Sequence, residues 1–401
     1  MEKLNKIFDS FATNLIFKNK SVLQSNYSPE EILHREEQVG AVASILGPTL
    51  KGEKVSNLFL YGKTGTGKTL TVRYVGAKLE EKMQQMGKDN LKFLYVNCKL
   101  KKVSDTEYRI IAELINVLGG KVPSTGLPTD AVYSRFIEMI DNKPQIIVLV
   151  LDEIDQAVKK ISDNFIYTLT RMNSELKNAQ ISLVGISNSL TFMDNLDPRV
   201  KSSLGEEEIV FPPYNALQLK DILKERATQA FGEGCLEEGV IEKCAAYAAR
   251  EHGDARRALD LLRVAGELAV RDDGKKVLLK HIDAANQKIE RDKMLDVIES
   301  EPTQFQLVLY SIMQLGENLP KENLSTGEVY NKYQELCEST KHEVLTQRRV
   351  SDILSEFDML GIINARVISK GRQGRTREIK LMLAPGIKDK AREILERTLD
   401  L

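Results

Sequence analysis

The sequence predicts an α/β core with a five-stranded, mostly parallel sheet, then an all-helical segment, and finally three helices closed by a β-hairpin. Three observations predict this order. Apolar runs alternate with helical patterns up to residue 214, only helical patterns follow to about residue 299, and two strand patterns flank a turn near residue 372. Alternating strands and helices favour a parallel sheet, because each parallel crossover needs a helix to return the chain.

Composition indicates a soluble protein of several domains. The chain has 401 residues, with 42% hydrophobic and 29% charged residues and a net charge of −1. No run of 18 apolar residues and no signal peptide is present, so we expect a cytoplasmic protein without a membrane span. The spacing of the four cysteines and four histidines indicates neither a zinc site nor disulfides. We expect an N-terminal arm and three further parts, at 1–29, 30–214, 215–299 and 300–401.

The first strong motif is a glycine-rich loop between an apolar run and a helix. Residues 62–69 match the pattern G-x-x-x-x-G-K-[ST], with Gly62, Gly67, Lys68 and Thr69 at its fixed positions. The positions between the two fixed glycines are occupied by Lys63, Thr64, Gly65 and Thr66. Backbone N–H groups of such a P-loop cradle phosphates, while Lys68 would reach the β- and γ-phosphates and the Thr69 hydroxyl a Mg²⁺ ion. The strand–loop–helix context disfavours a glycine-rich turn that binds nothing.

Two elements near the P-loop have open interpretations. An amphipathic helix from residue 30 to 46 is either a plain surface helix or part of an adenine pocket. After a short strand at 93–97, a helix at 104–118 leads into a loop at 119–128 that is dense in glycine and proline. A connection of this length is either a plain insertion or a functional loop.

Polar side chains follow the next two predicted strands. Asp152 and Glu153 end the apolar run at 146–151, and Asn188 follows the run at 181–186. Ligands bind at the carboxyl ends of parallel strands. In a P-loop protein Asp152 would hold Mg²⁺ and Glu153 would polarise the attacking water. Asn188 could orient that water or contact the γ-phosphate, and a plain strand-end cap is its alternative. A last strand is expected at 208–211.

The helical segment contains two cations in an unusual place. We expect helices near 216–231, 237–251, 254–271 and 279–299, and Arg256 and Arg257 fall in the first turn of the third. Cations at a helix N-terminus oppose the helix dipole, so an anionic group nearby would explain them. An ordinary surface charge is the alternative.

The C-terminal part reads as a winged helix with a basic hairpin. Helices are expected at about 302–316, 326–340 and 346–360, and strands at 362–369 and 376–383. Residues 366–380 carry six cations and one anion, a net charge of +5, which is typical of contact with a phosphate backbone. The alternative is an edge hairpin kept soluble by charge.

Taken together, these motifs resemble the archaeal origin-recognition initiator family of AAA+ ATPases. That family is related to the eukaryotic origin recognition complex subunits and the replicative helicase loader. The resemblance covers about residues 25–395 and is carried by the P-loop, the Asp152–Glu153 pair and three further segments, namely 34–38, 196–204 and 253–260.

The resemblance implies a role for each matching residue. Lys68 and Thr69 become the Walker A ligands, and Asp152 and Glu153 the Walker B pair. Asn188 resembles sensor 1 and Arg256, in the helical lid, sensor 2. Two further residues complete the expected site: Tyr214 at the nucleotide and Arg199, in the region where AAA+ proteins keep an arginine finger that acts on a neighbouring subunit.

The resemblance also implies DNA contacts. The 104–128 insertion would contact DNA through Lys121, Ser124 and Thr125. The helix at 346–357 would lie in the major groove, and the wing would enter a minor groove. The residues expected at these two contacts are Thr346, Gln347, Arg348, Arg349, Arg372 and Arg375.

The leading hypothesis is therefore an ATP-dependent replication initiator. It would use ATP or ADP with Mg²⁺, bind double-stranded origin DNA at the nucleoid, and meet the replicative helicase and other initiator subunits. ATP binding and slow hydrolysis would act as a conformational switch. The main alternative is a regulatory AAA+ ATPase whose winged helix binds promoters or protein partners. A helicase or remodelling motor is less favoured, since the chain has a single ATPase core.

Overall fold

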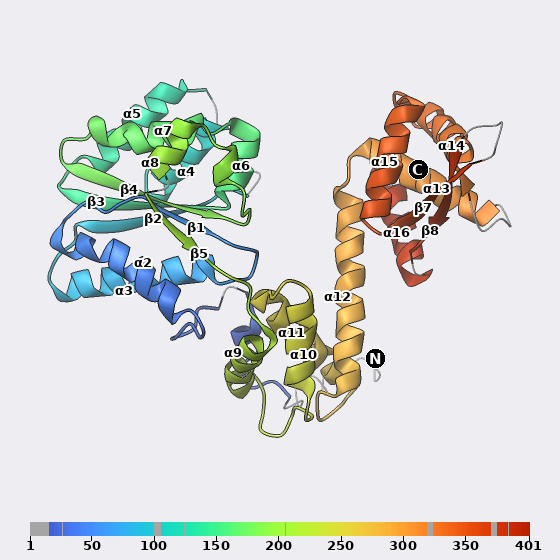
Figure 1. Ribbon diagram of the computed structural model, residues 1–401, viewed down its shortest axis with the longest axis horizontal. Helices are drawn as coiled ribbons and strands as arrows, with labels where there is room; N and C mark the ends of the chain where they lie inside the picture. Colours follow the sequence, from blue (N-terminus) through green and yellow to red (C-terminus); the bar gives the residue numbers. More distant parts are fainter. Residues whose placement is uncertain are drawn as a thin grey trace, which may run out of the picture. The chain divides into compact units, whose positions relative to one another are not determined.

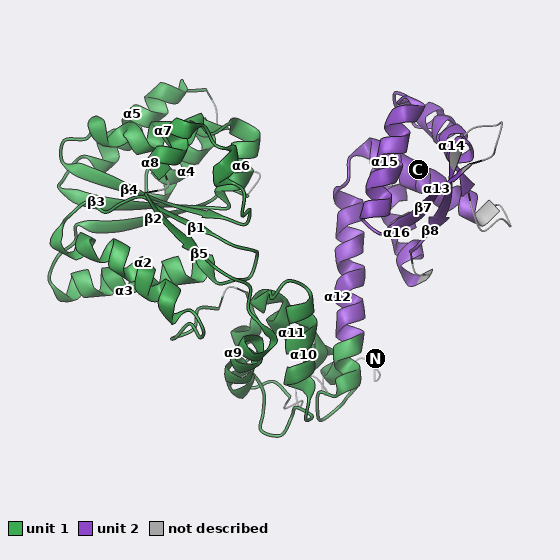
Figure 2. Cartoon of the chain, viewed as in Figure 1, with its two compact units in different colours: residues 1–283 green, residues 284–401 purple. Residues whose placement is uncertain are grey.

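The computed structural model describes residues 16–25, 27–99, 106–123, 126–204, 206–318, 324–369, 375–383 and 385–401 (Figure 1). The chain divides into two compact units, Met1–Asp283 and Ala284–Leu401 (Figure 2). We call them unit 1 and unit 2 and describe each by itself.

Unit 1 contains the predicted sheet. Its strands are β1 (Leu58–Tyr61), β2 (Leu91–Asn97), β3 (Gln145–Asp152), β4 (Ala179–Ser187) and β5 (Glu207–Val210), in the order β2-β3-β4-β1-β5. Every neighbouring pair is parallel, and β1 lies between β4 and β5. The prediction of a five-stranded α/β core is confirmed, and the described sheet is parallel throughout.

Helices cover both faces of this sheet. The side chains of β3 alternate between two apolar clusters, because successive residues of a strand point to opposite faces. Ile147, Leu149 and Leu151 join the cluster on one face, and Ile146, Val148 and Val150 the other. The first face is covered by α4 (Glu107–Val117), α5 (Thr129–Ile140), α6 (Ile154–Ile161), α7 (Asn164–Arg171) and α8 (Pro198–Leu204), and the second by α2 (Glu36–Leu46) and α3 (Lys68–Gln85) (Figure 1). Short 3-10 helices are η2 (Gly47–Lys51), η3 (Met172–Ser174) and η4 (Met193–Asn195).

A helical lid follows the sheet in unit 1. It consists of α9 (Ala216–Ala230), α10 (Val240–Arg250), α11 (Ala255–Arg271) and the first residues of α12 (Leu279–Ser300). Asn215 and Gln218 form a capping box at the start of α9, and Asp254 caps α11 by accepting from the backbone N–H of Arg256. The short 3-10 helix η1 (Lys20–Leu23), from the N-terminal arm, packs on α9 and α11.

Unit 2 is a winged helix. Its helices are α13 (Thr303–Asn318), α14 (Thr326–Ser339), α15 (Gln347–Met359) and α16 (Pro385–Leu399), and its strands are β6 (Leu324–Ser325), β7 (Ile363–Ser369) and β8 (Arg375–Leu381). The three strands form an antiparallel sheet in the order β6-β8-β7. The predicted helices and hairpin are present. Two elements of unit 2 were not predicted. The strand β6 has only two residues. The helix α16 does show a helical pattern, because Ala391, Leu395 and Leu399 recur every fourth residue and are buried.

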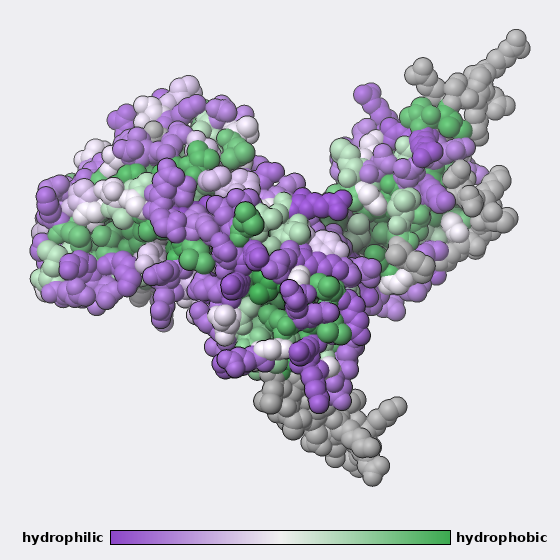
Figure 3. Space-filling model, turned by 60° about the horizontal axis from the view of Figure 1, so that its bottom comes forward, coloured by the Kyte–Doolittle hydropathy of each residue, from purple (hydrophilic) through white to green (hydrophobic). Residues whose placement is uncertain are grey.

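The surface carries the charge that the composition indicates. The face shown in Figure 3 is mostly hydrophilic, and its apolar residues appear in separate patches. Among the described residues, no helix is long and apolar enough to cross a bilayer.

The turn between α5 and β3 yields a first prediction. The Asp141 carboxylate accepts hydrogen bonds from the backbone N–H groups of Lys177, Asn178 and Ala179, at 2.6–3.1 Å, and these bonds lower its pKa. A lowered pKa adds stability above the unfolded-state value of about 4, and the contribution is lost as the pH falls through the folded-state pKa. Asp141→Asn should therefore lower the melting temperature at pH 7. The difference in melting temperature between the unaltered protein and the variant should shrink as the pH falls below about 4.

Melting curves followed by circular dichroism between neutral and acid pH test this expectation. Glu138→Gln removes an exposed carboxylate of α5 and serves as the control. A melting-temperature difference for Asp141→Asn that stays constant from neutral to acid pH would contradict the assignment.

Candidate functional site

The P-loop of unit 1 holds Lys68 in a buried position. The loop leaves β1, and α3 begins at Lys68. The Lys68 Nζ atom donates to the carbonyl oxygens of Gly62 (2.7 Å) and Lys63 (2.8 Å) and to Asn188 Oδ1 (3.0 Å). The pKa of Lys68 is lowered to about 8, chiefly by burial and in part by the nearby Arg256 guanidinium, while the Asp152 carboxylate acts in the opposite direction. The site therefore places two cations near each other, and an anionic ligand would relieve both the burial and the repulsion.

Beside Lys68 lies a pair of oxygen ligands suited to a hard cation. The Thr69 hydroxyl donates to Asp152 Oδ2 at 2.9 Å, which joins the start of α3 to the end of β3. Hydroxyl and carboxylate oxygens are the protein ligands that Mg²⁺ accepts, together with water and phosphate oxygens. Both the phosphate of a nucleotide and its Mg²⁺ thus fit the residues present.

Two further carboxylates, Glu153 and Asp155, follow the end of β3. Glu153 adopts the left-handed conformation with φ 55°, which is uncommon for a residue with a side chain, and its Oε2 lies 3.7 Å from Lys99 Nζ. Asp155 is buried and accepts from the Ser187 hydroxyl at 2.9 Å and, at 3.4 Å, from the backbone N–H of Asn188. Asp155 thus fixes the end of β4 that presents the Asn188 side chain to Lys68.

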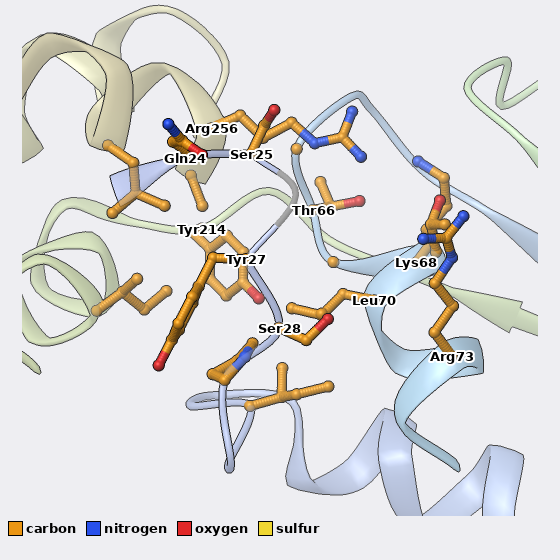
Figure 4. Close-up of a pocket in the computed structure, with 18 of the residues that line it drawn as sticks. Gln24, Ser25, Tyr27, Ser28, Thr66, Lys68, Leu70, Arg73, Tyr214 and Arg256 are labelled. Carbon is orange, nitrogen blue, oxygen red and sulfur yellow. The ribbon is translucent and has the colours of Figure 1, made fainter. Parts of the chain in front are cut away.

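Lys68, Thr69, Asp152, Glu153 and Asn188 line a cavity of about 560 Å³ within unit 1. Such a volume is typical of small-molecule sites. Figure 4 shows Arg256 reaching from the lid toward the P-loop, where Thr66 and Lys68 lie. The cavity has three walls, which come from the core, from the lid and from the N-terminal residues Val22 to Leu33.

The P-loop also contacts the lid directly. The backbone N–H of Ala255 donates to the Gly65 carbonyl at 3.2 Å. Gly65 has a φ of 70°, and a Cβ atom at this position would overlap the Asp254 carboxylate. A side chain at residue 65 would therefore both strain the loop and push the start of α11 away from it.

Arg35 connects the P-loop to the linker between core and lid. Its side chain is only 2% exposed, and Nε donates to the Thr66 carbonyl at 2.9 Å while a terminal nitrogen donates to the Pro212 carbonyl. The guanidinium also stacks on the Tyr214 ring, with 3.8 Å between its central carbon and the ring centroid. Burial lowers the pKa of Arg35. This side chain thus fixes Tyr214, a predicted nucleotide contact, relative to the P-loop.

We expect Arg35→Ala to destabilise unit 1 by about 3 kcal/mol, because each lost hydrogen bond from a charged donor costs ~1.5–3 kcal/mol. The urea midpoint, followed by circular dichroism, measures this loss. Arg35→Lys should recover only part of it, since an ammonium group cannot replace the planar fork or its stacking. Arg135→Ala, at an exposed position of α5, is the control. If the two alanine variants unfold at the same urea concentration, the connecting role of Arg35 is wrong.

Most residues predicted for nucleotide chemistry meet in this cavity. They are Gly65, Thr66, Gly67, Lys68, Thr69, Asp152, Glu153, Asn188, Tyr214 and Arg256. Gly62 and Lys63 contact Lys68 through their carbonyl oxygens, and Thr64 lies between them and Gly65 in the loop. Arg199 does not line the cavity; its Nε lies 3.0 Å from Asp197 Oδ1, and its guanidinium faces the Tyr167 ring.

Three features of the site were missed from the sequence. Arg35 was recognised within a motif but given no role, Asp155 was not singled out, and residues 22–29 were not expected to reach the cavity.

The DNA contacts predicted in unit 2 are partly described. Thr346 caps α15 by accepting from the Arg349 N–H, and Thr346, Gln347, Arg348 and Arg349 are all exposed. Arg377 instead donates to Ser351 O (3.1 Å) and Ser355 Oγ (2.7 Å), so it fastens β8 to α15. Of the residues expected in the wing, Arg375 begins β8, and Arg372 lies outside the described residues. Of those expected in the insertion of unit 1, Lys121 follows α4, and Ser124 and Thr125 lie outside the described residues.

Sequence models of three protein domains match the chain in order. An "AAA domain" matches residues 53–193, a "Cdc6 AAA+ ATPase-type lid domain" matches 220–287, and a "CDC6, C terminal winged helix domain" matches 296–391. Together they cover strands β1 to β4 of the parallel sheet, most of the helical lid and most of the winged helix.

Whole-chain relatives are also similar. The chain is 54% identical over 389 residues to an ORC1-type DNA replication protein of Pyrococcus abyssi, with 95% of this chain and 91% of the relative covered. It is 52% identical over 370 residues to ORC1-type DNA replication protein 1 of Methanosarcina acetivorans, covering 91% and 87%. Among solved structures, Aeropyrum pernix ORC1 in complex with DNA matches with a TM-score of 0.82 and 46% identity, covering 95% of this chain and 97% of that one.

Proposed function

Since the chain belongs to the family of ORC1-type DNA replication proteins, we propose that it is an ATP-controlled initiator that binds origin DNA and helps to recruit the replicative helicase. Its AAA domain and Cdc6-type lid make it a member of the AAA+ ATPases. Membership of the family of ORC1-type DNA replication proteins favours the initiator over the regulatory ATPase and the motor.

One observation carries the ATP control. Lys68, Thr69 and Asp152 from the core and Arg256 from the lid line the same cavity. A ligand that touches both parts stabilises the arrangement in which they meet, and it shifts the population of arrangements by its difference in affinity for them. We propose that ATP acts on unit 1 in this way and that its conversion to ADP releases the lid cation from the γ-phosphate.

The proposed chemistry assigns a task to each side chain. Lys68 binds the β- and γ-phosphates, Arg256 the γ-phosphate, and Thr69 and Asp152 hold Mg²⁺, which supplies charge neutralisation when bound. Glu153 polarises the attacking water and Asn188 orients it. We propose slow hydrolysis, supported by the Lys99 ammonium 3.7 Å from Glu153 Oε2, since an ion pair with Lys99 competes with the attacking water for this carboxylate.

The proposed DNA contact begins at the N-terminus of α15. Support comes from the DNA complex of the similar Aeropyrum pernix protein and from the exposed side chains of Gln347, Arg348 and Arg349. A recognition helix of this kind enters the major groove with its first turn. The wing and Lys121 would add contacts to phosphates. Arg199, which lies away from the cavity of its own chain, is proposed to act on the nucleotide of another initiator subunit.

The double variant Arg348→Ala/Arg349→Ala should weaken DNA binding and flatten its salt dependence. Each phosphate contact contributes about 0.9 to the slope of log affinity against log salt, so two lost contacts should reduce the slope by about 2. Fluorescence anisotropy on a duplex, measured from low to physiological salt, gives the slope. Lys332→Ala/Lys390→Ala removes the same charge from α14 and α16 as the control. An unchanged slope for the arginine variant would move the DNA site elsewhere.

DNA footprinting tests the initiator assignment as a whole. The purified protein is placed on candidate origin regions of its own genome at a stated salt concentration, with ATP and with ADP. Discrete protected sites that depend on the nucleotide are the expected result. Protection spread evenly over any DNA, or confined to promoters, would contradict origin binding.

A further inference from the structure

The N-terminal wall of the cavity is part of a segment that is fastened to the lid. We call residues 16–25 and 27–29 the strap. The backbone N–H groups of Lys18 and Asn19 donate to the Ala230 carbonyl at 2.8 and 3.1 Å, and the Gly232 N–H donates to the Ile16 carbonyl at 3.0 Å. Ile16, Val22 and Leu23 are buried. The first half of the strap is thus built into the lid, although 190 or more residues separate the two in the chain.

Phe17 is the anchor of this attachment. Its ring packs against Phe231 with 4.9 Å between centroids and lies over Gly266 of α11. A Cβ atom on Gly266 would overlap the end of the Phe17 ring and would come within 3.0 Å of the Phe231 ring. Nearby, the Lys20 ammonium lies 2.7 Å from Glu267, which also pairs with Arg263. Glycine at residue 266 therefore provides the space that the anchor occupies.

The second half of the strap faces the cavity. Gln24, Ser25, Tyr27, Ser28 and Pro29 line it, whereas Phe17 does not. Tyr27 is held from the lid side, because its hydroxyl donates to Gln229 Oε1 at 3.1 Å and the Arg226 guanidinium lies 4.6 Å from its ring centroid. In Figure 4, Tyr27 lies to the left of the view and Lys68 to the right. The P-loop takes the phosphates, so this wall is left for the base and ribose.

We propose that the strap is a positioning segment that forms the base-side wall of the nucleotide cavity and that Phe17 and Gly266 hold this wall on the lid. The inference rests on the proposed nucleotide function. An aromatic ring and a proline are suited to the flat, apolar faces of a purine. A wall carried by the lid lets the lid bind the nucleotide at both ends, through Arg256 at the phosphates and through the strap at the base.

The inference makes a reciprocal prediction. If docking of the strap strengthens nucleotide binding, then nucleotide must strengthen docking of the strap by the same factor. ADP should therefore protect the Lys18 and Lys20 peptide bonds from trypsin, because a docked segment is cleaved only when it opens. Inorganic tripolyphosphate, which lacks the base and ribose, should protect these bonds far less.

The experiment uses the full chain with two anchor variants, Gly266→Ala and Phe17→Ala. Calorimetric titration with ADP should show a loss of affinity of about tenfold in each, equivalent to ~1.4 kcal/mol, whereas the affinity for tripolyphosphate should stay within about twofold of that of the unaltered protein. Gly40→Ala is the matched control, since Gly40 lies in α2 and an added Cβ would meet no atom within 4 Å. Mass spectrometry of the tryptic fragments reports strap docking in the same samples.

The outcomes separate the two claims. If the unaltered protein binds neither ADP nor tripolyphosphate, the proposed nucleotide function is wrong. If it binds both, and both folded anchor variants bind ADP as the unaltered protein does, the strap inference is overturned and the nucleotide function stands. Equal losses for ADP and tripolyphosphate would also overturn it, since they would indicate general damage to the lid. Phe17→Ala keeps the test decisive if Gly266→Ala does not fold, because Phe17 lies outside every helix of unit 1.

Discussion

Glu153→Gln is expected to slow ATP hydrolysis at least 100-fold while ADP affinity stays within about twofold of that of the unaltered protein, because a general base contributes roughly 10²–10⁴ to a rate. Glutamine keeps the size of the side chain but cannot polarise the attacking water. Glu153 also adopts a left-handed backbone conformation at the end of β3, which either residue would have to keep. Release of radioactive phosphate measures hydrolysis, and calorimetric titration measures affinity.

Glu37→Gln is a suitable control, because Glu37 is exposed on α2 and does not line the cavity. It should hydrolyse ATP at the unaltered rate. Loss of ADP binding in Glu153→Gln would show instead that the carboxylate maintains the structure of the site, for example through its ion pair with Lys99.

Lys68→Ala should weaken the binding of both ATP and ADP on the order of 100-fold, since charged hydrogen bonds contribute roughly 1.5–3 kcal/mol each. In the structure this ammonium group already lies among two P-loop carbonyl oxygens and Asn188, so the variant also removes the group that closes the loop around the phosphates. Calorimetric titration with each nucleotide measures the loss.

The control for this variant is Lys78→Ala, which removes an exposed ammonium nearly three turns along the same helix and disturbs only an ion pair with Glu81. Its affinity should equal that of the unaltered protein. Unchanged affinity in Lys68→Ala, measured on folded protein, would show that the P-loop of this chain does not bind the phosphates.

The sheet and the phosphate side of the cavity could be predicted because their signals are contiguous in the sequence. The strand β3 is a continuous apolar run with both faces covered, and the P-loop is a fixed pattern between a strand and a helix. The two-residue strand β6 has no such contiguous pattern in the sequence. The strand β6 exists only because Leu324 and Ser325 pair with Ile379 and Glu378, so its stability comes from a partner more than 50 residues away.

The connections between the parts of the site could not be predicted for the same physical reason. Arg35 contacts the Pro212 carbonyl across 177 residues, and the strap contacts the lid across a longer distance in the chain. A buried arginine in a run of polar residues looks like any surface cation until its partners are known. Periodicity and motifs report on neighbours within a few turns, whereas these contacts are set by tertiary packing.

The position of β1 in the sheet has a consequence for folding during synthesis on the ribosome. Leu58 pairs with Val184 on one side and with Glu207 on the other, so one hydrogen-bonding edge of the strand before the P-loop stays open until β4 has been made and the other until β5, the last strand, has been made. At about 5–20 residues per second, roughly 150 residues of further synthesis take at least several seconds. During that time the nascent chain displays an apolar strand with at least one unpaired edge, which is the kind of segment that chaperones bind and that aggregates when left uncovered.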